Sequence, residues 1–171
     1  RDRSKGGVPG HRRPQLQAKA PSTTGYSYFG QKVDTDICTT MPASFPHGFT
    51  CFTNFCDRHT AELFLYFQVG VSSDEVSSAL TDFEARTEGR LTEGKVWIWY
   101  TDNDLAFEGP EVKEVSAKLV GEHHRGPAGD ANKNTNPVAE RSIGTIRQMI
   151  LAMCAFPRQY GQDAAPECLW S

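Results

Sequence analysis

The 171-residue sequence contains no long hydrophobic run. A membrane-spanning helix needs roughly 18 consecutive apolar residues, and the first residues of this chain are basic and polar, so we predict neither a membrane span nor a secretory signal. The cysteines are odd in number and form no Cys-x-x-Cys pair, which argues against a zinc knuckle and a disulfide framework. They are Cys38, Cys51, Cys56, Cys154 and Cys168. These absences favour a soluble protein in a reduced, intracellular setting.

Patterns for several common kinds of catalysis are absent too. The sequence has no phosphate-binding loop and no Ser-His-Asp arrangement. His123 and His124 are adjacent rather than at ligand spacing, so a metal site there is disfavoured. Cys51, Cys56 and His59 are predicted to be core residues, because strand alternation turns the two cysteines to opposite faces.

Charge is unevenly distributed along the chain. Residues 1–20 carry six Lys or Arg against one Asp, a local charge of +5, so the remainder carries −8 of the total of −3. Residues 1–24 lack apolar periodicity, which is typical of a flexible basic arm or linker that attracts phosphate. Residues 25–171 are predicted to form one domain. We interpret the chain as a fragment of a longer polypeptide because it begins at Arg1 rather than at a methionine.

The first half of the domain carries strand patterns followed by a helix pattern. Period-two alternation and aromatic-rich segments predict a meander of three strands, at residues 31–38, 49–55 and 61–68. A capping box of Ser72 and Glu75 then begins a helix that ends near Thr87.

The second half alternates strand and helix. A wholly apolar run predicts a buried strand at residues 96–100, in which Trp97 and Trp99 pack in the core. A short helix at 111–120 and a mobile polar loop at 121–136 follow. Asn136 as N-cap begins a last helix, which should end before Pro157. This order of elements predicts an α/β fold, RNase H-like, with a mixed sheet of about five strands flanked by helices.

Three acidic residues stand where these elements can bring them together. Asp36 shares one face of the first strand with Asp34, Asp102 follows the buried strand, and Glu140 lies in the first turn of the last helix. Each has an ordinary alternative: an edge strand facing water, turn chemistry, or a favourable helix dipole. A cluster of three carboxylates, by contrast, is the ligand set that two divalent cations need for phosphoryl transfer.

Short motifs surround the three acids. They are Asp-Ile-Cys at 36–38, Thr-Asn-Phe-Cys-Asp-Arg-His-Thr at 53–60, Thr-Asp-Asn-Asp-Leu-Ala-Phe at 101–107 and Asn-Pro-Val-Ala-Glu-Arg at 136–141. In this order they resemble motifs of the catalytic cores of retroviral and retrotransposon integrases, most closely the copia type. The family's motifs read Asp-hydrophobic-Cys-Gly-Pro, Asp-x-x-Ser/Thr-Arg, Ser/Thr-Asp-Asn-Gly-x-Glu-Phe and Asn-Gly-Val/Ile-Ala-Glu-Arg. The resemblance covers roughly residues 26–170.

The chain departs from the family's motifs at five places. In the second motif, the order of the residues after Asp57 is altered. The Gly-Pro after Cys38 is lost, and Asp104, Ala106 and Pro137 replace a glycine, a glutamate and a glycine. Asp102 and Glu140 are 38 positions apart, two more than in the family's usual Asp-x35-Glu pattern, and a loop absorbs such a difference easily.

The resemblance implies an enzyme of DNA integration. Asp36, Asp102 and Glu140 would coordinate two Mg²⁺ or Mn²⁺ ions, with no other small-molecule cofactor. They would catalyse 3′-end processing and strand transfer of retroelement DNA into target DNA, while Asp57 would be structural. The implied partners are DNA and further copies of the chain. No association with a membrane is implied, and the implied location is the nucleus.

Four residues are candidates for nucleic-acid contact. Asn103 can orient a carboxylate or contact DNA, and Arg141 can reach a phosphate. Lys133 lies in the segment 126–136, which can close over DNA ends, and Asn136 ends that segment. A solvated arginine and a plain surface loop are the ordinary alternatives.

Two other functions remain open. A decayed or domesticated core would keep the fold but only bind nucleic acid or self-associate, and the acidic body and the motif departures favour it. An RNase H-like nuclease would need a further carboxylate on the helix after the meander, where Glu84 stands.

Overall fold

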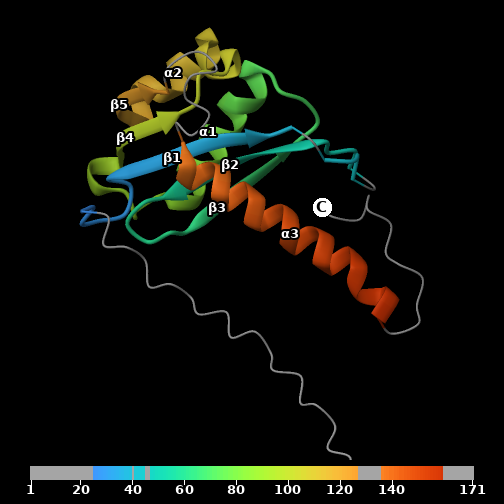
Figure 1. Ribbon diagram of the computed structural model, residues 1–171. Coiled ribbons are helices and arrows are strands. Elements are labelled where there is room, and N and C mark those ends of the chain that lie inside the picture. Colours follow the sequence, from blue (N-terminus) through green and yellow to red (C-terminus); the bar gives the residue numbers. More distant parts are fainter. Residues whose placement is uncertain (1–24, 40, 45–46, 127–135, 160–171) are drawn as a thin grey trace, which may run out of the picture.

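The computed structural model describes residues 25–39, 41–44, 47–126 and 136–159. The predicted basic arm, residues 1–24, lies outside the described residues. A search of the described helices finds none with the length and apolar character that crossing a membrane requires. Helices pack on both faces of a single sheet (Figure 1).

The sheet has five strands in the order β3-β2-β1-β4-β5. They are β1 (Lys32–Cys38), β2 (Cys51–Asp57), β3 (Leu63–Gln68), β4 (Val96–Thr101) and β5 (Val120–Arg125). β1, β2 and β3 form an antiparallel meander, whereas β4 is parallel to both β1 and β5. The predicted mixed α/β sheet is therefore confirmed, and β1 is its central strand.

One face of the sheet is covered by α1 (Ser73–Thr87) and α2 (Pro110–Leu119). The Ser72 hydroxyl accepts a hydrogen bond from the Glu75 N–H at 3.3 Å, so the predicted capping box begins α1. Apolar residues at helical spacing face the sheet and are buried: Val76, Ala79, Leu80 and Phe83. They pack against alternate strand residues, including Val33, Phe55 and Trp99.

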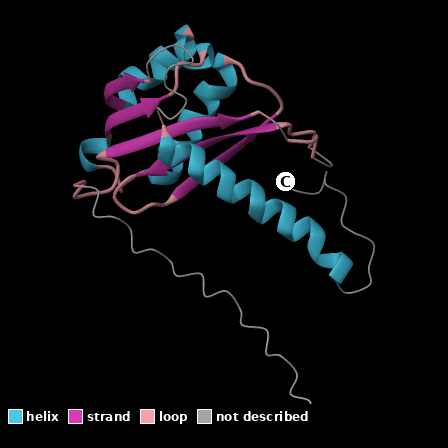
Figure 2. Ribbon diagram, viewed as in Figure 1, coloured by secondary structure: helices cyan, strands magenta, loops and turns pink. Residues whose placement is uncertain are grey.

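The other face is covered by α3 (Pro137–Gln159), the orange helix that crosses in front of the strands in Figure 1 and stands apart from the other helices in Figure 2. Its Ile146 packs with Cys38 of β1 and Phe52 of β2. α3 continues past Pro157, where the sequence predicted its end. A proline removes one backbone donor, and this loss falls in the last turn of a 23-residue helix.

The strand β5 includes residues 121–125, which were predicted to be part of a mobile loop, so that prediction is wrong for these residues. Residues 127–135 of the predicted loop lie outside the described residues. β5 pairs in parallel with β4, with Trp99 opposite His123 and Thr101 opposite Arg125. As an edge strand it exposes most of its side chains. It therefore lacks the alternation of polar and apolar residues that marks a half-buried strand.

The burial of β4 also differs from the prediction. Trp99 is 1% exposed and packs in the core as expected, but Trp97 is 45% exposed, so the strand is not wholly buried. Cys51 and Cys56 are buried, which confirms their assignment to the core. His59 is exposed in the turn after β2, so the prediction that it belongs to the core is wrong.

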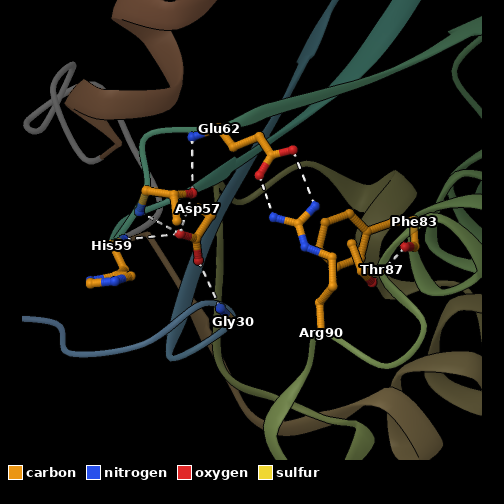
Figure 3. A network of polar contacts seen from close by, with 8 residues as sticks. Gly30, Asp57, His59, Glu62, Phe83, Thr87 and Arg90 are labelled. Carbon is orange, nitrogen blue, oxygen red and sulfur yellow. Dashed lines mark hydrogen bonds and ion pairs between the residues drawn. The ribbon is translucent and has the colours of Figure 1, made fainter.

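Asp57 anchors the turn after β2, as Figure 3 shows. Its buried carboxylate accepts hydrogen bonds from the N–H groups of Gly30, His59 and Thr60 at 2.8, 3.1 and 2.7 Å, and from the Thr60 hydroxyl at 2.8 Å. The carboxylate thereby ties the turn between β2 and β3 to the segment that enters β1. Its structural role agrees with the expectation for this motif.

Candidate active site

Asp36 and Asp102 lie side by side on the α3 face of the sheet. The parallel register of β1 and β4 pairs Thr35 with Thr101, so each aspartate is the next residue along its strand direction. Because β1 is the central strand, the alternative in which Asp36 sits on a water-facing edge strand is wrong. Side chains alternate across a strand, so both aspartates point away from the α1 and α2 face.

Asp34 shares this face but has its own partners. It is 2% exposed, 2.7 Å from the Arg58 Nε and 3.8 Å from the Lys32 Nζ. Burial raises the pKa of Asp34, and the charges of Arg58 and Lys32 oppose that rise. Asp34 is therefore an ion-paired residue of the sheet interior.

Hydrogen bonds hold the first turn of α3, which carries Glu140, against the sheet. The Asn136 amide donates to the Thr35 carbonyl at 3.0 Å. From β2, the Asn54 amide donates to the Ser142 hydroxyl at 2.6 Å, which in turn donates to the Ala139 carbonyl at 2.7 Å.

The charges of the three candidate acids act on one another. Burial raises the pKa of Asp36 to about 6, assisted by the charges of Asp102, Glu140 and Asp104 and opposed by the Ile37 N–H. Burial also raises the pKa of Asp102, with the charges of Asp104 and Glu140 adding to the rise. β1, β4 and α3 therefore bring Asp36, Asp102 and Glu140 into one electrostatic group.

Asp104 is a fourth carboxylate of this group that the motif comparison did not identify as a site residue. It stands where the resembled motif has glycine, and that departure was the available signal. Its Oδ1 accepts from the Ala106 N–H at 2.9 Å and so caps the short 3-10 helix Leu105–Glu108. Its own N–H donates to the Asp102 Oδ1 at 3.2 Å, which fixes one carboxylate oxygen of Asp102.

The donor set fits a hard divalent cation. Asp36, Asp102 and Glu140 offer carboxylate oxygens, which Mg²⁺ and Mn²⁺ prefer. The buried Oδ1 atoms of Asn54 and Asn136 lack hydrogen-bond partners, so polar acceptors remain on the same side of the sheet. Within the described ranges, however, no three His, Cys, Asp or Glu side chains adopt metal-ligand geometry. A cation would have to draw the mutually repelling carboxylates together.

The candidate nucleic-acid contacts lie in different surroundings. Asn103 is exposed beside Asp102, and Arg141 is exposed on α3 with its Nε donating to the Pro137 carbonyl at 2.8 Å. Asn136 is 2% exposed and ties α3 to β1, so its burial disfavours the predicted contact with nucleic acid. Lys133 lies outside the described residues.

A cavity of about 340 Å³ lies away from these carboxylates, at the C-terminal end of α1. Glu84 lines it and is exposed on a helix that covers the opposite face of the sheet. This position disfavours the RNase H-like nuclease in which Glu84 joins the carboxylate cluster.

Comparison with solved structures identifies the fold. The chain is similar to the simian T-cell lymphotropic virus intasome in complex with PP2A regulatory subunit B56 gamma. That match has TM-score 0.56 and 16% identity, and it covers 71% of this chain and 40% of that chain. The chain is also similar to the HTLV-2 integrase catalytic core domain in complex with magnesium. The dimeric form of the latter has TM-score 0.54 and 17% identity over 72% of each chain. Its trimeric form has TM-score 0.52 and 17% identity over 71% of this chain and 70% of that chain.

These neighbours define the class of fold. The chain has the RNase H-like fold of retroviral integrase catalytic cores. Neither a protein-family model nor a curated protein matches the sequence. The chain spans 40% of the length of the intasome protein, and a likeness at 16–17% identity shows the fold alone.

The raised pKa of Asp36 predicts a pH-dependent cost of folding. A carboxyl that titrates near 6 in the folded protein, against 3.8 ordinarily, binds its proton more tightly when folded. The contribution of the protonated Asp36 carboxyl to the free energy of unfolding is therefore fully present below about pH 4. It is lost as the pH rises through about 6. We expect Asp36→Asn to stabilise the metal-free protein by about 2 kcal/mol at neutral pH, measured by urea unfolding.

Asp74→Asn is the matched control, because it removes the same charge from an exposed position in the first turn of α1. It should change the stability by no more than about 0.5 kcal/mol. An Asp36→Asn protein with unchanged or lower stability at neutral pH would contradict the expected repulsion.

Proposed function

We propose that this chain is the catalytic core of a retroelement integrase, of the copia type, that transfers polynucleotides in a metal-dependent reaction. The observation that carries the proposal is the electrostatic coupling of Asp36 to Asp102 and Glu140 on β1, β4 and α3. The fold shared with retroviral integrase cores and the order of the motifs support it. At this level of identity the fold alone does not assign a reaction.

The three acids would hold two Mg²⁺ or Mn²⁺ ions. Such ions activate the attacking water or 3′-hydroxyl and stabilise the leaving oxygen. Asp36 and Asp102 extend from paired strands, which limits the motion of their backbones. The Asp104 N–H fixes one oxygen of Asp102, while Glu140 is exposed at the start of α3 and can turn toward an approaching cation.

The proposed substrates are retroelement DNA ends and target DNA. Asn103 and Arg141 offer exposed hydrogen-bond donors next to Asp102 and Glu140, where the phosphate backbone of DNA would lie. Lys133 is proposed to contact the same backbone. One neighbour is an intasome, and the HTLV-2 core occurs in dimeric and trimeric forms. By analogy we propose self-association and a nuclear location for this chain.

A decayed or domesticated core is the second candidate. It is favoured by Ala106, which is 7% exposed where the resembled motif carries a glutamate, and by the absence of ligand geometry among the described acids. Such a protein would bind nucleic acid or self-associate without catalysis.

An assay on branched DNA separates the active integrase core from the decayed core. Strand transfer exchanges one phosphodiester for another, so it can run backwards on a branched DNA that mimics its product, and the substrate then arrives already assembled. We expect the chain to resolve such a branched DNA with Mn²⁺ or Mg²⁺ and to lose this activity with a chelator. Binding of the branched DNA without metal-dependent resolution would assign the decayed core instead.

A further inference from the structure

Two threonines directly precede the candidate catalytic aspartates and face the opposite side of the sheet. Thr35 precedes Asp36, Thr101 precedes Asp102, and the two threonines are register partners in the pairing of β1 with β4. Both are fully buried. Whatever fixes these two hydroxyls also fixes the backbone from which both aspartates extend.

A stacked pair of rings contacts both hydroxyls. The rings of Trp99 and His123 stack with centroids 4.3 Å apart and planes 24° from parallel. The Trp99 Nε1–H donates to the Thr35 hydroxyl at 2.8 Å, and the His123 Nε2 lies 2.9 Å from the Thr101 hydroxyl. One aromatic unit therefore spans β1, β4 and β5 directly behind the acids.

The hydrogen bonds of Thr101 determine which atom of His123 carries the proton. The Thr101 hydroxyl donates to the Asp102 carbonyl at 3.0 Å, and a hydroxyl has a single proton to give. The His123 Nε2 must therefore be the donor in its contact with Thr101. This sequence of donors orients the peptide group after Asp102 at the place where β4 ends.

The surroundings of His123 keep the ring neutral at neutral pH. Burial lowers the pKa of His123 to about 4, with the charges of Arg125 and His124 lowering it further and Glu108 opposing them. A neutral ring carries one N–H, so the Nε2–H form leaves Nδ1 bare.

We propose that Trp99 and His123 form a clamp that positions the catalytic carboxylates, with the His123 Nε2–H holding the Thr101 hydroxyl and the Trp99 Nε1–H holding that of Thr35. The inference rests on the proposed function, since it concerns the geometry of Asp36 and Asp102 as ligands. Both rings lie on the face of the sheet opposite Asp36 and Asp102, so both are positioning residues. Ligand geometry of this kind must hold to within about 0.5 Å to be productive.

The tautomer of His123 tests the clamp without reference to catalysis. Long-range ¹H–¹⁵N NMR of the histidine rings of the full chain, near neutral pH, distinguishes the two neutral forms, and His124→Phe assigns the neighbouring signal. The clamp requires a neutral His123 with its proton on Nε2. A proton on Nδ1 would overturn it.

Variants then test the effect on the acids. His123→Phe keeps a ring against Trp99 but removes the donor, and we expect it to weaken Mn²⁺ binding by about tenfold and to lower kcat on branched DNA by about 10- to 100-fold. The KM for DNA should stay unchanged. His123→Gln, which restores a donor, should recover part of the loss, and Thr101→Ser should behave like the unmodified chain. The control His124→Phe removes an exposed imidazole that pairs with Glu122, and it should change neither Mn²⁺ binding nor kcat.

Failure of the clamp differs from failure of the proposed function. If the unmodified chain neither binds Mn²⁺ nor resolves DNA, the proposed function fails, and the backbone ¹⁵N signal of Asp102 decides about the clamp. That signal should shift in His123→Phe and Thr101→Val but not in His124→Phe. An Asp102 signal that stays in place, or normal Mn²⁺ binding by His123→Phe, would overturn the inference.

Discussion

Asp102→Asn should lower the rate of DNA resolution by about a thousandfold or more while the fold persists. An amide is neutral and has one acceptor oxygen, so it cannot hold a cation as a carboxylate does. The side chain at position 102 cannot move to another place to reach the cation. The end of β4 holds its backbone, and the Asp104 N–H holds one of its side-chain oxygens. The variant should also keep its stability, since the change removes a half-buried charge that lies among other carboxylates. Single-turnover rates on branched DNA with Mn²⁺ measure the loss, and circular dichroism reports the fold.

Asp104→Asn is the comparison variant. It removes the same charge two residues away, and an asparagine Oδ1 can still cap the 3-10 helix through the Ala106 N–H. We expect it to retain activity within about tenfold of the unmodified chain, because the resembled motif has glycine at this position. Equal losses in Asp102→Asn and Asp104→Asn would mean that the charge of the cluster matters more than its ligand positions. The assignment of Asp102 as a specific metal ligand would then be wrong.

Asp57→Ala should be strongly destabilising, at a cost of about 4 kcal/mol. Removing the carboxylate leaves the N–H groups of Gly30, His59 and Thr60 without their acceptor. Since a domain of this size is stable by about 5–15 kcal/mol, the loss should be large in urea unfolding.

Two variants make the Asp57 measurement specific. Asp57→Asn keeps one acceptor and should lose less than Asp57→Ala. Asp82→Ala removes a carboxylate that pairs with Arg86 on the surface of α1 and should cost about 0.5 kcal/mol or less. If Asp57→Ala unfolds at nearly the same urea concentration as Asp82→Ala, the anchoring role of Asp57 is wrong.

The elements that the sequence predicted well are those whose signals are local. The capping box of Ser72 and Glu75 and the apolar spacing up to Phe83 were sufficient for α1. Alternation along β1 correctly placed Val33 and Asp34 on opposite faces of the sheet, with Val33 in the core beneath α1 and Asp34 paired with Arg58. Asp36, Asp102 and Glu140 lie on the strand, the strand end and the helix start where the sequence placed them.

The features that the sequence did not predict depend on partners distant in the chain. Alternation along β1 does not reveal whether the polar face meets water or another helix, and the order of strands decides this. β5 forms because its backbone pairs with β4, although its side chains are mostly polar. The role of His123 was hidden for the same reason, since its ring meets Trp99 and Thr101 only through that pairing.

The two strands that pair with β1 are separated from it by chain segments of very different length. On one side, a connection of a dozen or so residues leads to β2, whereas on the other β4 begins only after β2, β3 and α1. Closing a longer loop costs more entropy before contacts compensate for it, so the meander can assemble first and β4 later. Asp36 and Asp102 become neighbours only at that later step. Divalent cations should therefore leave the early rate of refolding unchanged and act by slowing unfolding.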